Sequence, residues 1–153
     1  PPKASPDRAR ASALSAEAAG PILRELGFDE ARTRAVQHAI HAHSFSAGVA
    51  PTTLEAKILQ DADRMEALGA IGVARTFYTA GLMRSALFDA DDPFAASRPL
   101  DDRRYALDHF AAKLLKLPAT MQTEAGRALT EGRLAVMHAF LAAIADELGV
   151  DRP

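Results

Sequence analysis

Apolar residues recur at helical spacing along nearly the whole chain, and no stretch shows the two-residue alternation of a half-buried strand. This pattern predicts helices over residues 7–27, 30–43, 52–88, 103–117 and 121–149. Gly20-Pro21 is expected to kink or split the first helix, and Pro118 to mark the end of the fourth. The sequence therefore predicts an all-α chain of about five to seven helices.

Capping residues stand where the predicted helices begin. Asp29 is expected to cap the second helix, and Thr52 with Glu55 three residues later matches a capping box for the third. Asp101 or Asp102 should cap the fourth. Between these helices, "SFSAGVAP" and "DADDPFAASRPL" have the composition of loops.

Glycines mark helix ends and one unusual helix interior. Gly27 and Gly149 stand where C-terminal glycine caps are expected. Gly69, Gly72 and Gly81 punctuate the long third helix. Glycines at such positions either break a helix or allow another backbone to come close to it.

Two carboxylates lie one residue apart in this third helix, within "ILQDADRMEALGAIG". At about 100° per residue, Asp61 falls within an apolar stripe, whereas Asp63 lies on the opposite side. Both sides are rich in apolar residues, so the helix is expected to be surrounded. A buried ionised carboxylate costs several kcal/mol unless a cation or hydrogen bonds compensate it. Arg64, Lys57, neighbouring N–H groups or histidines could do so, or one aspartate could bind a divalent cation or position a water.

The five histidines do not have the spacing of a known metal-binding motif. No pair has the four-residue spacing of a helical metal pair. His43, at a helix end, is placed to face a cleft, and His109 shares a helix face with Lys113, which suits contact with an anion. His138, in the apolar last helix, is expected to be an ordinary, partly buried histidine.

Composition excludes several classes of protein. The 153 residues are 48% apolar and 25% charged, which favours one domain spanning 1–153. A formal net charge of -2 and scattered basic residues give no reason to bind nucleic acid or an acidic membrane. There is no cysteine, no apolar run of about 18 residues and no glycine-rich phosphate loop. A cytoplasmic protein is expected, and the start at Pro1 without Met suggests that residues are missing before it.

Three stretches closely resemble the HD-superfamily metal-dependent phosphohydrolases, and in particular a bacterial subgroup of small HD-domain proteins that includes nucleotide pyrophosphohydrolases. The His-Ser, Thr-Leu-Glu-Ala-Lys and Asp-Ala-Asp-Arg elements of the middle stretch occur in the order and spacing of that family. The resemblance implies a compact multi-helix HD-domain bundle. The stretches are "PKASPDRARASALSAEAA", "AIHAHSFSAGVAPTTLEAKILQDADRMEALGAIGVAR" and "ALFDADDPFAASRPLDDRRYALDHFAAKLLKLPATMQTEAGRAL".

The resemblance also assigns roles. In that family a histidine, a His-Asp pair and a distant aspartate hold one divalent metal, which would be Mn²⁺, Mg²⁺ or a similar ion. The distant aspartate belongs to an Ala-Asp-Arg element, which corresponds to Asp63 here. Asp61 is then a buried support. No His-Asp dipeptide occurs in the 153 residues, so the other ligands are expected before Pro1. Candidates to bind phosphoryl oxygens are Lys3, His43, Arg64 and Lys113.

These features predict a metal-dependent phosphohydrolase that hydrolyses a small phosphorylated substrate, a nucleotide, with metal-activated water. The alternative is a nucleotide-binding or regulatory helical module that has lost catalysis, which the missing His-Asp pair favours. A purely structural helical protein gives no reason for two inward aspartates.

Overall fold

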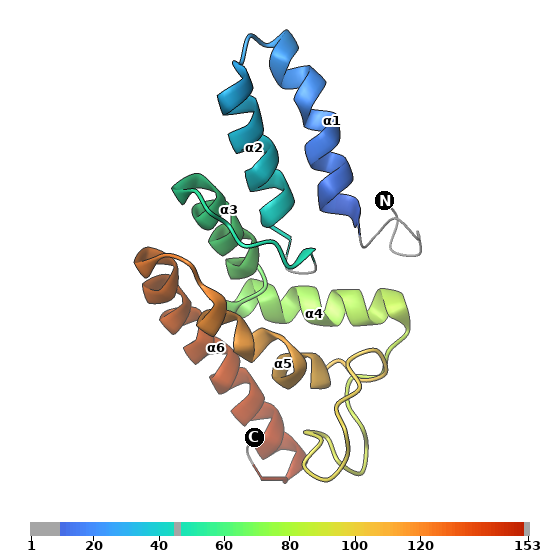
Figure 1. Ribbon diagram of the computed structural model, residues 1–153. Helices are drawn as coiled ribbons and strands as arrows, with labels where there is room; N and C mark the ends of the chain where they lie inside the picture. Colours follow the sequence, from blue (N-terminus) through green and yellow to red (C-terminus); the bar gives the residue numbers. More distant parts are fainter. Residues whose placement is uncertain (1–9, 45–46, 152–153) are drawn as a thin grey trace. The chain divides into compact units, whose positions relative to one another are not determined.

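The computed structural model describes residues 10–44 and 47–151, and the all-α prediction is confirmed (Figure 1). The chain divides into two compact units, Pro1–Arg64 and Met65–Pro153, called unit 1 and unit 2 below. Each is described by itself, and the expectation of a single domain stays a prediction. The elements are α1 Ala11–Glu25, α2 Glu30–Ala42, α3 Leu54–Met65, α4 Gly69–Met83, α5 Asp108–Ala112, the 3-10 helix η3 Leu114–Thr120 and α6 Glu124–Leu148.

In unit 1, α1 and α2 pack side by side as a helical hairpin (Figure 1). The predicted split at Gly20-Pro21 is wrong, because α1 continues through both residues. Gly20 is needed for packing instead: a Cβ there would lie 2.8 Å from Nε2 of Gln37, which donates a hydrogen bond to the Ala16 carbonyl. The predicted Asp29 cap is confirmed, since its carboxylate accepts the Arg32 N–H at 2.8 Å.

The start of α3 differs from the predicted capping box. Thr53, not Thr52, accepts the N–H of Ala56 through its side-chain oxygen, at 3.2 Å. Thr52 is used differently: its N–H and its hydroxyl each lie 3.0 Å from Nε2 of His38. The Thr52 hydroxyl, which was predicted to cap α3, therefore connects the preceding loop to His38 of α2.

The predicted long helix over 52–88 is interrupted between α3 and α4. Gly69, the first residue of α4, has φ +71°, a conformation that glycine adopts without strain. A Cβ at Gly72 would lie 2.2 Å from the carbonyl oxygen of Ala67, so only glycine fits there. The prediction is thus confirmed for Gly69 and Gly72, whereas Gly81 lies inside α4 with open space around it.

Unit 2 is built around one apolar core. α4 packs on α6, and η3 packs on both α5 and α6. One phenylalanine from each of α4, α5 and α6 meets in the core: the Phe77 ring lies edge-on to Phe140 at 5.6 Å, and Phe110 stacks on Phe140 at 5.9 Å. The buried core residues are Leu68, Leu107, Phe110, Leu114, Leu117, Met121, Met137 and Leu141.

The predicted helix over 103–117 is wrong for its first part. The backbone of this segment pairs with the chain near Ala86: Ala86 N–H donates to the Arg104 carbonyl and Ala106 N–H to the Ala86 carbonyl, both at 2.9 Å. Groups paired in this way cannot form helical bonds. Asp101 accepts the N–H groups of Arg103 and Arg104 and so stabilises a turn. Pro118 lies inside η3 and does not end it.

The last helix, α6, ends as expected but begins at Glu124, three residues after the predicted start at residue 121. Thr123 accepts the Gly126 N–H, and Gly149 ends the helix with φ +68°. Among the described residues, α6 is also the helix that is long and apolar enough to cross a membrane, although length and composition alone are weak evidence. Its Met137 and Leu141 are buried in the core of unit 2.

Candidate functional site

The two aspartates of α3 lie in different surroundings, as their helical positions predict. Asp61 is buried, with 3% of its surface exposed, whereas Asp63 is exposed. The expectation that α3 is surrounded on both sides is wrong, because Leu54 and Ile58 are 63% and 53% exposed. Burial on α3 is confined to Ala56, Gln60 and Asp61.

Gln60, beside Asp61, is a buried polar residue that the sequence analysis missed. Its Nε2 donates to the Ala42 carbonyl at 2.6 Å and so ties α3 to the last residue of α2. Its Oε1 is buried and has no hydrogen-bond partner among the described residues. Two consecutive polar residues of α3, Gln60 and Asp61, are therefore buried.

Arg64 follows the aspartates at the end of α3. Burial lowers the pKa of its guanidinium, and the charges of Asp61 and Asp63 act in the opposite direction. An arginine stays protonated in proteins under either influence. Arg64 is thus a fixed positive charge beside both carboxylates, which fits its role as their partner as well as contact with a phosphate.

Ring nitrogens of His38 and His43 make hydrogen bonds. Nδ1 of His43 contacts the Ile40 carbonyl, which can only accept, so Nδ1 carries a proton. Nε2 of His38 accepts from the Thr52 N–H, so the lone pair of this nitrogen is occupied. His38 has a structural role that its spacing in the sequence did not reveal.

The predicted site residues are distributed over both units. Unit 1 contains His43, Asp61, Asp63 and Arg64, and unit 2 contains Lys113. Lys3 lies outside the described residues. The Lys113 N–H donates to the carbonyl of His109 at 3.0 Å, so these two residues are one helical turn apart.

The described residues do not form a divalent metal site on their own. Within residues 10–44 and 47–151 there is no group of three or more His, Asp or Glu residues that could hold a metal ion. Selective and tight binding needs several convergent ligands. Asp63 therefore remains a single candidate ligand.

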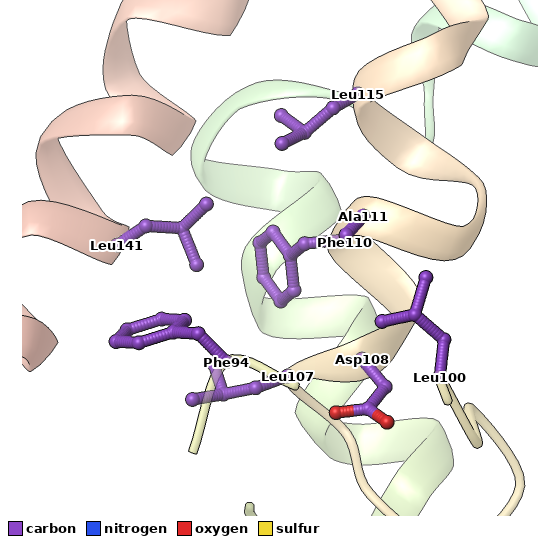
Figure 2. Close-up of a pocket in the computed structure, with 8 residues that line it drawn as sticks. All are labelled: Phe94, Leu100, Leu107, Asp108, Phe110, Ala111, Leu115 and Leu141. Atoms are coloured by element: carbon purple, nitrogen blue, oxygen red, sulfur yellow. The ribbon is translucent and has the colours of Figure 1, made fainter. Parts of the chain in front are cut away.

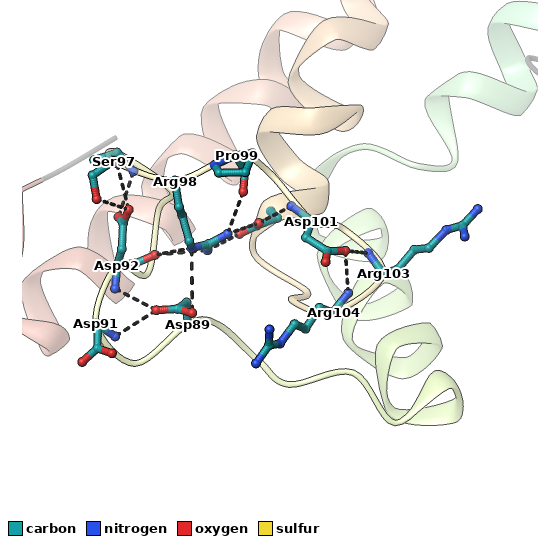
Figure 3. Close-up of polar contacts among 11 residues, drawn as sticks. Asp89, Asp91, Asp92, Ser97, Arg98, Pro99, Asp101, Arg103 and Arg104 are labelled. Atoms are coloured by element: carbon teal, nitrogen blue, oxygen red, sulfur yellow. Dashed lines mark hydrogen bonds and ion pairs between the residues drawn. The ribbon is translucent and has the colours of Figure 1, made fainter.

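A polar network in the loop before α5 was not predicted from the sequence, and Arg98 is its centre (Figure 3). Arg98 donates to both carboxylate oxygens of Asp108, at 2.6 and 2.8 Å, and to the carbonyl of Asp92. Asp101 N–H adds a third bond to Asp108, at 2.7 Å. The guanidinium also lies 4.5 Å from the centre of the Tyr105 ring. The network folds "DADDPFAASRPL" against the start of α5.

The same contacts set the ionisation of the loop. Burial by itself raises the pKa of Asp108, but the hydrogen bonds from Arg98 and Asp101 N–H outweigh it and keep this pKa below its usual value. Hydrogen bonds from Tyr105 and from two backbone N–H groups lower the pKa of Asp89, and bonds from Ser97 and Ala96 lower that of Asp92. These aspartates are therefore carboxylates at neutral pH.

A small pocket lies beside Asp108 (Figure 2). Its walls are apolar apart from this carboxylate, and both oxygens of Asp108 already accept hydrogen bonds from Arg98. The charged group of this pocket is thus already paired with Arg98. It is lined by Phe94, Leu100, Leu107, Asp108, Phe110, Ala111, Leu115 and Leu141.

Known proteins resemble this chain in sequence and in fold, although no family model matches it. The uncharacterized protein YpgQ of Bacillus subtilis is 36% identical over 103 residues, which are 67% of this chain and 42% of YpgQ. The chain thus spans about two fifths of the length of this curated relative.

Solved structures extend the similarity to most of the chain. The crystal structure of YpgQ in complex with ADP has a TM-score of 0.69 and 30% identity, covering 86% of this chain and 61% of YpgQ. An HD-superfamily hydrolase from Bacillus thuringiensis has a TM-score of 0.68 and 33% identity, covering 89% of this chain and 63% of the hydrolase. The Lin1889 protein of Listeria innocua has a TM-score of 0.72 and 25% identity over 92% of this chain and 69% of its own. Together with the all-α fold and the Asp-Ala-Asp-Arg element, these similarities place the chain among the small bacterial HD-like proteins.

Proposed function

We propose that this protein is a phosphohydrolase that uses a divalent metal ion, Mn²⁺ or Mg²⁺, to hydrolyse a phosphate bond in a small compound. The observation that carries the proposal is the similarity in fold and sequence to an HD-superfamily hydrolase. Because one fold supports several reactions, the fold alone does not select the bond that is cleaved.

A nucleotide is the substrate that we propose. YpgQ, which resembles this chain in sequence and fold, was crystallised in complex with ADP. A nucleotide polyphosphate offers several negative charges to cationic side chains. Lys3, His43, Arg64 and Lys113 are the candidates to bind its phosphoryl oxygens.

Within this proposal Asp63 is one ligand of the metal, and the remaining ligands lie outside the described residues. Its exposed position on α3 leaves its carboxylate accessible to a cation. Asp61 is buried and supports the helix instead. The two aspartates therefore have separable roles, and two single variants can distinguish them.

Phosphate release from ADP and other nucleotides, measured on the complete protein with and without Mn²⁺, tests the proposal. We expect Asp63→Asn to abolish metal-stimulated release with an unchanged melting temperature, because an exposed carboxylate contributes little to stability. Asp61→Asn should lower the melting temperature, because it alters a buried polar group. Glu17→Gln, a change at an exposed position on α1, is the matched control and should change neither quantity.

Two results would contradict the proposal. One is a complete protein without metal-stimulated release from any nucleotide. The other is release that persists unchanged in Asp63→Asn.

A second candidate is a nucleotide-binding module without catalysis. It is favoured by the lack of a metal-ligand cluster among the described residues and of any His-Asp dipeptide in the 153 residues. Such a module would bind ADP in a calorimeter with or without Mn²⁺ but release no phosphate. The two candidates thus differ in turnover and in metal dependence.

A further inference from the structure

A histidine and a carboxylate form a pair at the start of α5. Nδ1 of His109 lies 2.8 Å from Oδ2 of Asp102. The two side chains are 30% and 40% exposed, so solutes can reach them. A carboxylate accepts hydrogen bonds, so this contact places a proton on Nδ1 and orients the imidazole ring.

The fold fixes both members of this pair through their neighbours in sequence. Asp101, next to Asp102, donates its N–H to Asp108, next to His109, at 2.7 Å. Asp108 is buried and is held by Arg98 through both of its carboxylate oxygens. Asp102 and His109 are therefore each next to a residue of one hydrogen-bonded group, formed by Arg98, Asp101 and Asp108, part of which Figure 3 shows.

The remaining ring nitrogen gives the pair its chemistry. Nε2 of His109 makes no hydrogen bond to any residue that the structure describes. When the ring is doubly protonated, Asp102 accepts one N–H, and the second N–H is left to donate to a ligand. Such charge-assisted bonds are strong to phosphate oxygens.

Charged residues of both signs neighbour the pair in the sequence. Segment 101–116 contains four Arg or Lys residues and three Asp residues, leaving His109 aside. Lys113 follows His109 by one helical turn.

We propose that His109, oriented by Asp102, binds a phosphoryl oxygen of a nucleotide through Nε2–H. This deepens the proposed function and rests on it, because it names a phosphate-binding residue for the same substrate class. Asp102 is a positioning residue that acts through the imidazole.

Calorimetric titration of the complete protein with ADP, and separately with inorganic pyrophosphate, tests the inference. It is carried out in EDTA, so that no metal mediates binding. We expect His109→Gln to weaken binding of both probes about ten- to one-hundredfold, the range for a hydrogen bond to a charged group. Asp102→Asn should weaken binding by less, and Asp102→Glu should restore it. His138→Gln is the control, since His138 is exposed on α6, contrary to its expected partial burial.

The imidazole nitrogen resonances separate binding from a structural effect. We expect pyrophosphate to shift the Nε2 signal of His109 and leave that of His138 unchanged. Equal affinity of the parent and His109→Gln, or an unmoved Nε2 signal, would overturn the inference. The proposed function fails separately: phosphate release with Mn²⁺ can be absent while binding still depends on His109, or present while binding does not.

Discussion

Replacing Arg98 with methionine is predicted to destabilise unit 2 strongly. The change keeps an unbranched side chain but removes the guanidinium from Asp108, which has no exposed side-chain surface. Asp108 would keep the bond from Asp101 N–H and lose both bonds from Arg98. The result is a buried carboxylate without its counter-charge.

The magnitude follows from burial. Breaking a buried ion pair by removing one partner costs about 3–5 kcal/mol, because the remaining charge is uncompensated. The side chain of Arg98 is 19% exposed, so partial solvation places the expected loss toward the lower end of that range. By contrast, Arg75→Met breaks the pair with Glu66, whose side chains are 58% and 73% exposed, and should cost under about 1 kcal/mol.

Urea unfolding followed by tyrosine fluorescence measures this loss. The chain has no tryptophan, and its two tyrosines, Tyr78 and Tyr105, both lie in unit 2. Adding Asp108→Asn to Arg98→Met removes the unpaired charge. The double variant should therefore be more stable than the sum of the single effects predicts, by about 0.5–3 kcal/mol.

The pH dependence of stability gives an independent test, because the direction of the change is predicted. Because the native pKa of Asp108 lies below its usual value of about 3.9, its carboxylate stabilises the native state above that pH, and the contribution is lost as the pH falls through the native pKa. Without Arg98, burial raises the pKa of Asp108, and acid then neutralises the unpaired charge. The difference in free energy of unfolding between the parent and Arg98→Met should therefore become smaller below about pH 4. Two results would refute this reasoning. One is a loss of unfolding free energy in Arg98→Met that is as small as the loss in Arg75→Met. The other is a loss that becomes larger in acid.

The remaining predictions concern local geometry and are checked by the same unfolding experiment or by circular dichroism. Gly72→Ala should destabilise by about 1–3 kcal/mol, because its Cβ would meet a backbone carbonyl at 2.2 Å. Gly81→Ala, in the same helix with open space around it, should instead stabilise by up to about 1 kcal/mol. Thr53→Ala should cost about 1 kcal/mol through the lost cap of α3. An equal loss in Thr52→Val would leave the capping role unassigned between the two threonines.

Much of the fold follows from local signals. The cap at Asp29 and the glycines at 27, 69 and 149 act on their own backbone neighbours, so sequence spacing places them well. The prediction of a helix at residues 103–107 was wrong for a non-local reason. Its backbone pairs with residues near Ala86, and no local propensity reports a partner that distant in sequence. The Thr52 error is similar, because His38 competes for that threonine.

The candidate site was less predictable for the same reason. Helical periodicity separated Asp61 from Asp63, and the structure places one inside and the other outside. It did not predict that Leu54 and Ile58 would be exposed beside them. Periodicity reports which residues share a face, but what covers a face depends on the rest of the fold.

The hydrogen bonds that each aspartate already accepts decide which carboxylate can bind a ligand. In "DADDP", Asp89 and Asp92 accept backbone N–H groups, and Asp108 accepts Arg98, so these acidic residues already have their donors. Asp63 differs, since its carboxylate accepts no hydrogen bond from the residues that the structure describes and is exposed. A cation competes poorly for a carboxylate whose lone pairs are occupied and well for one that is hydrated. Asp63 is for this reason a better candidate ligand than the more conspicuous acidic cluster, and the Asp63→Asn assay tests that difference directly.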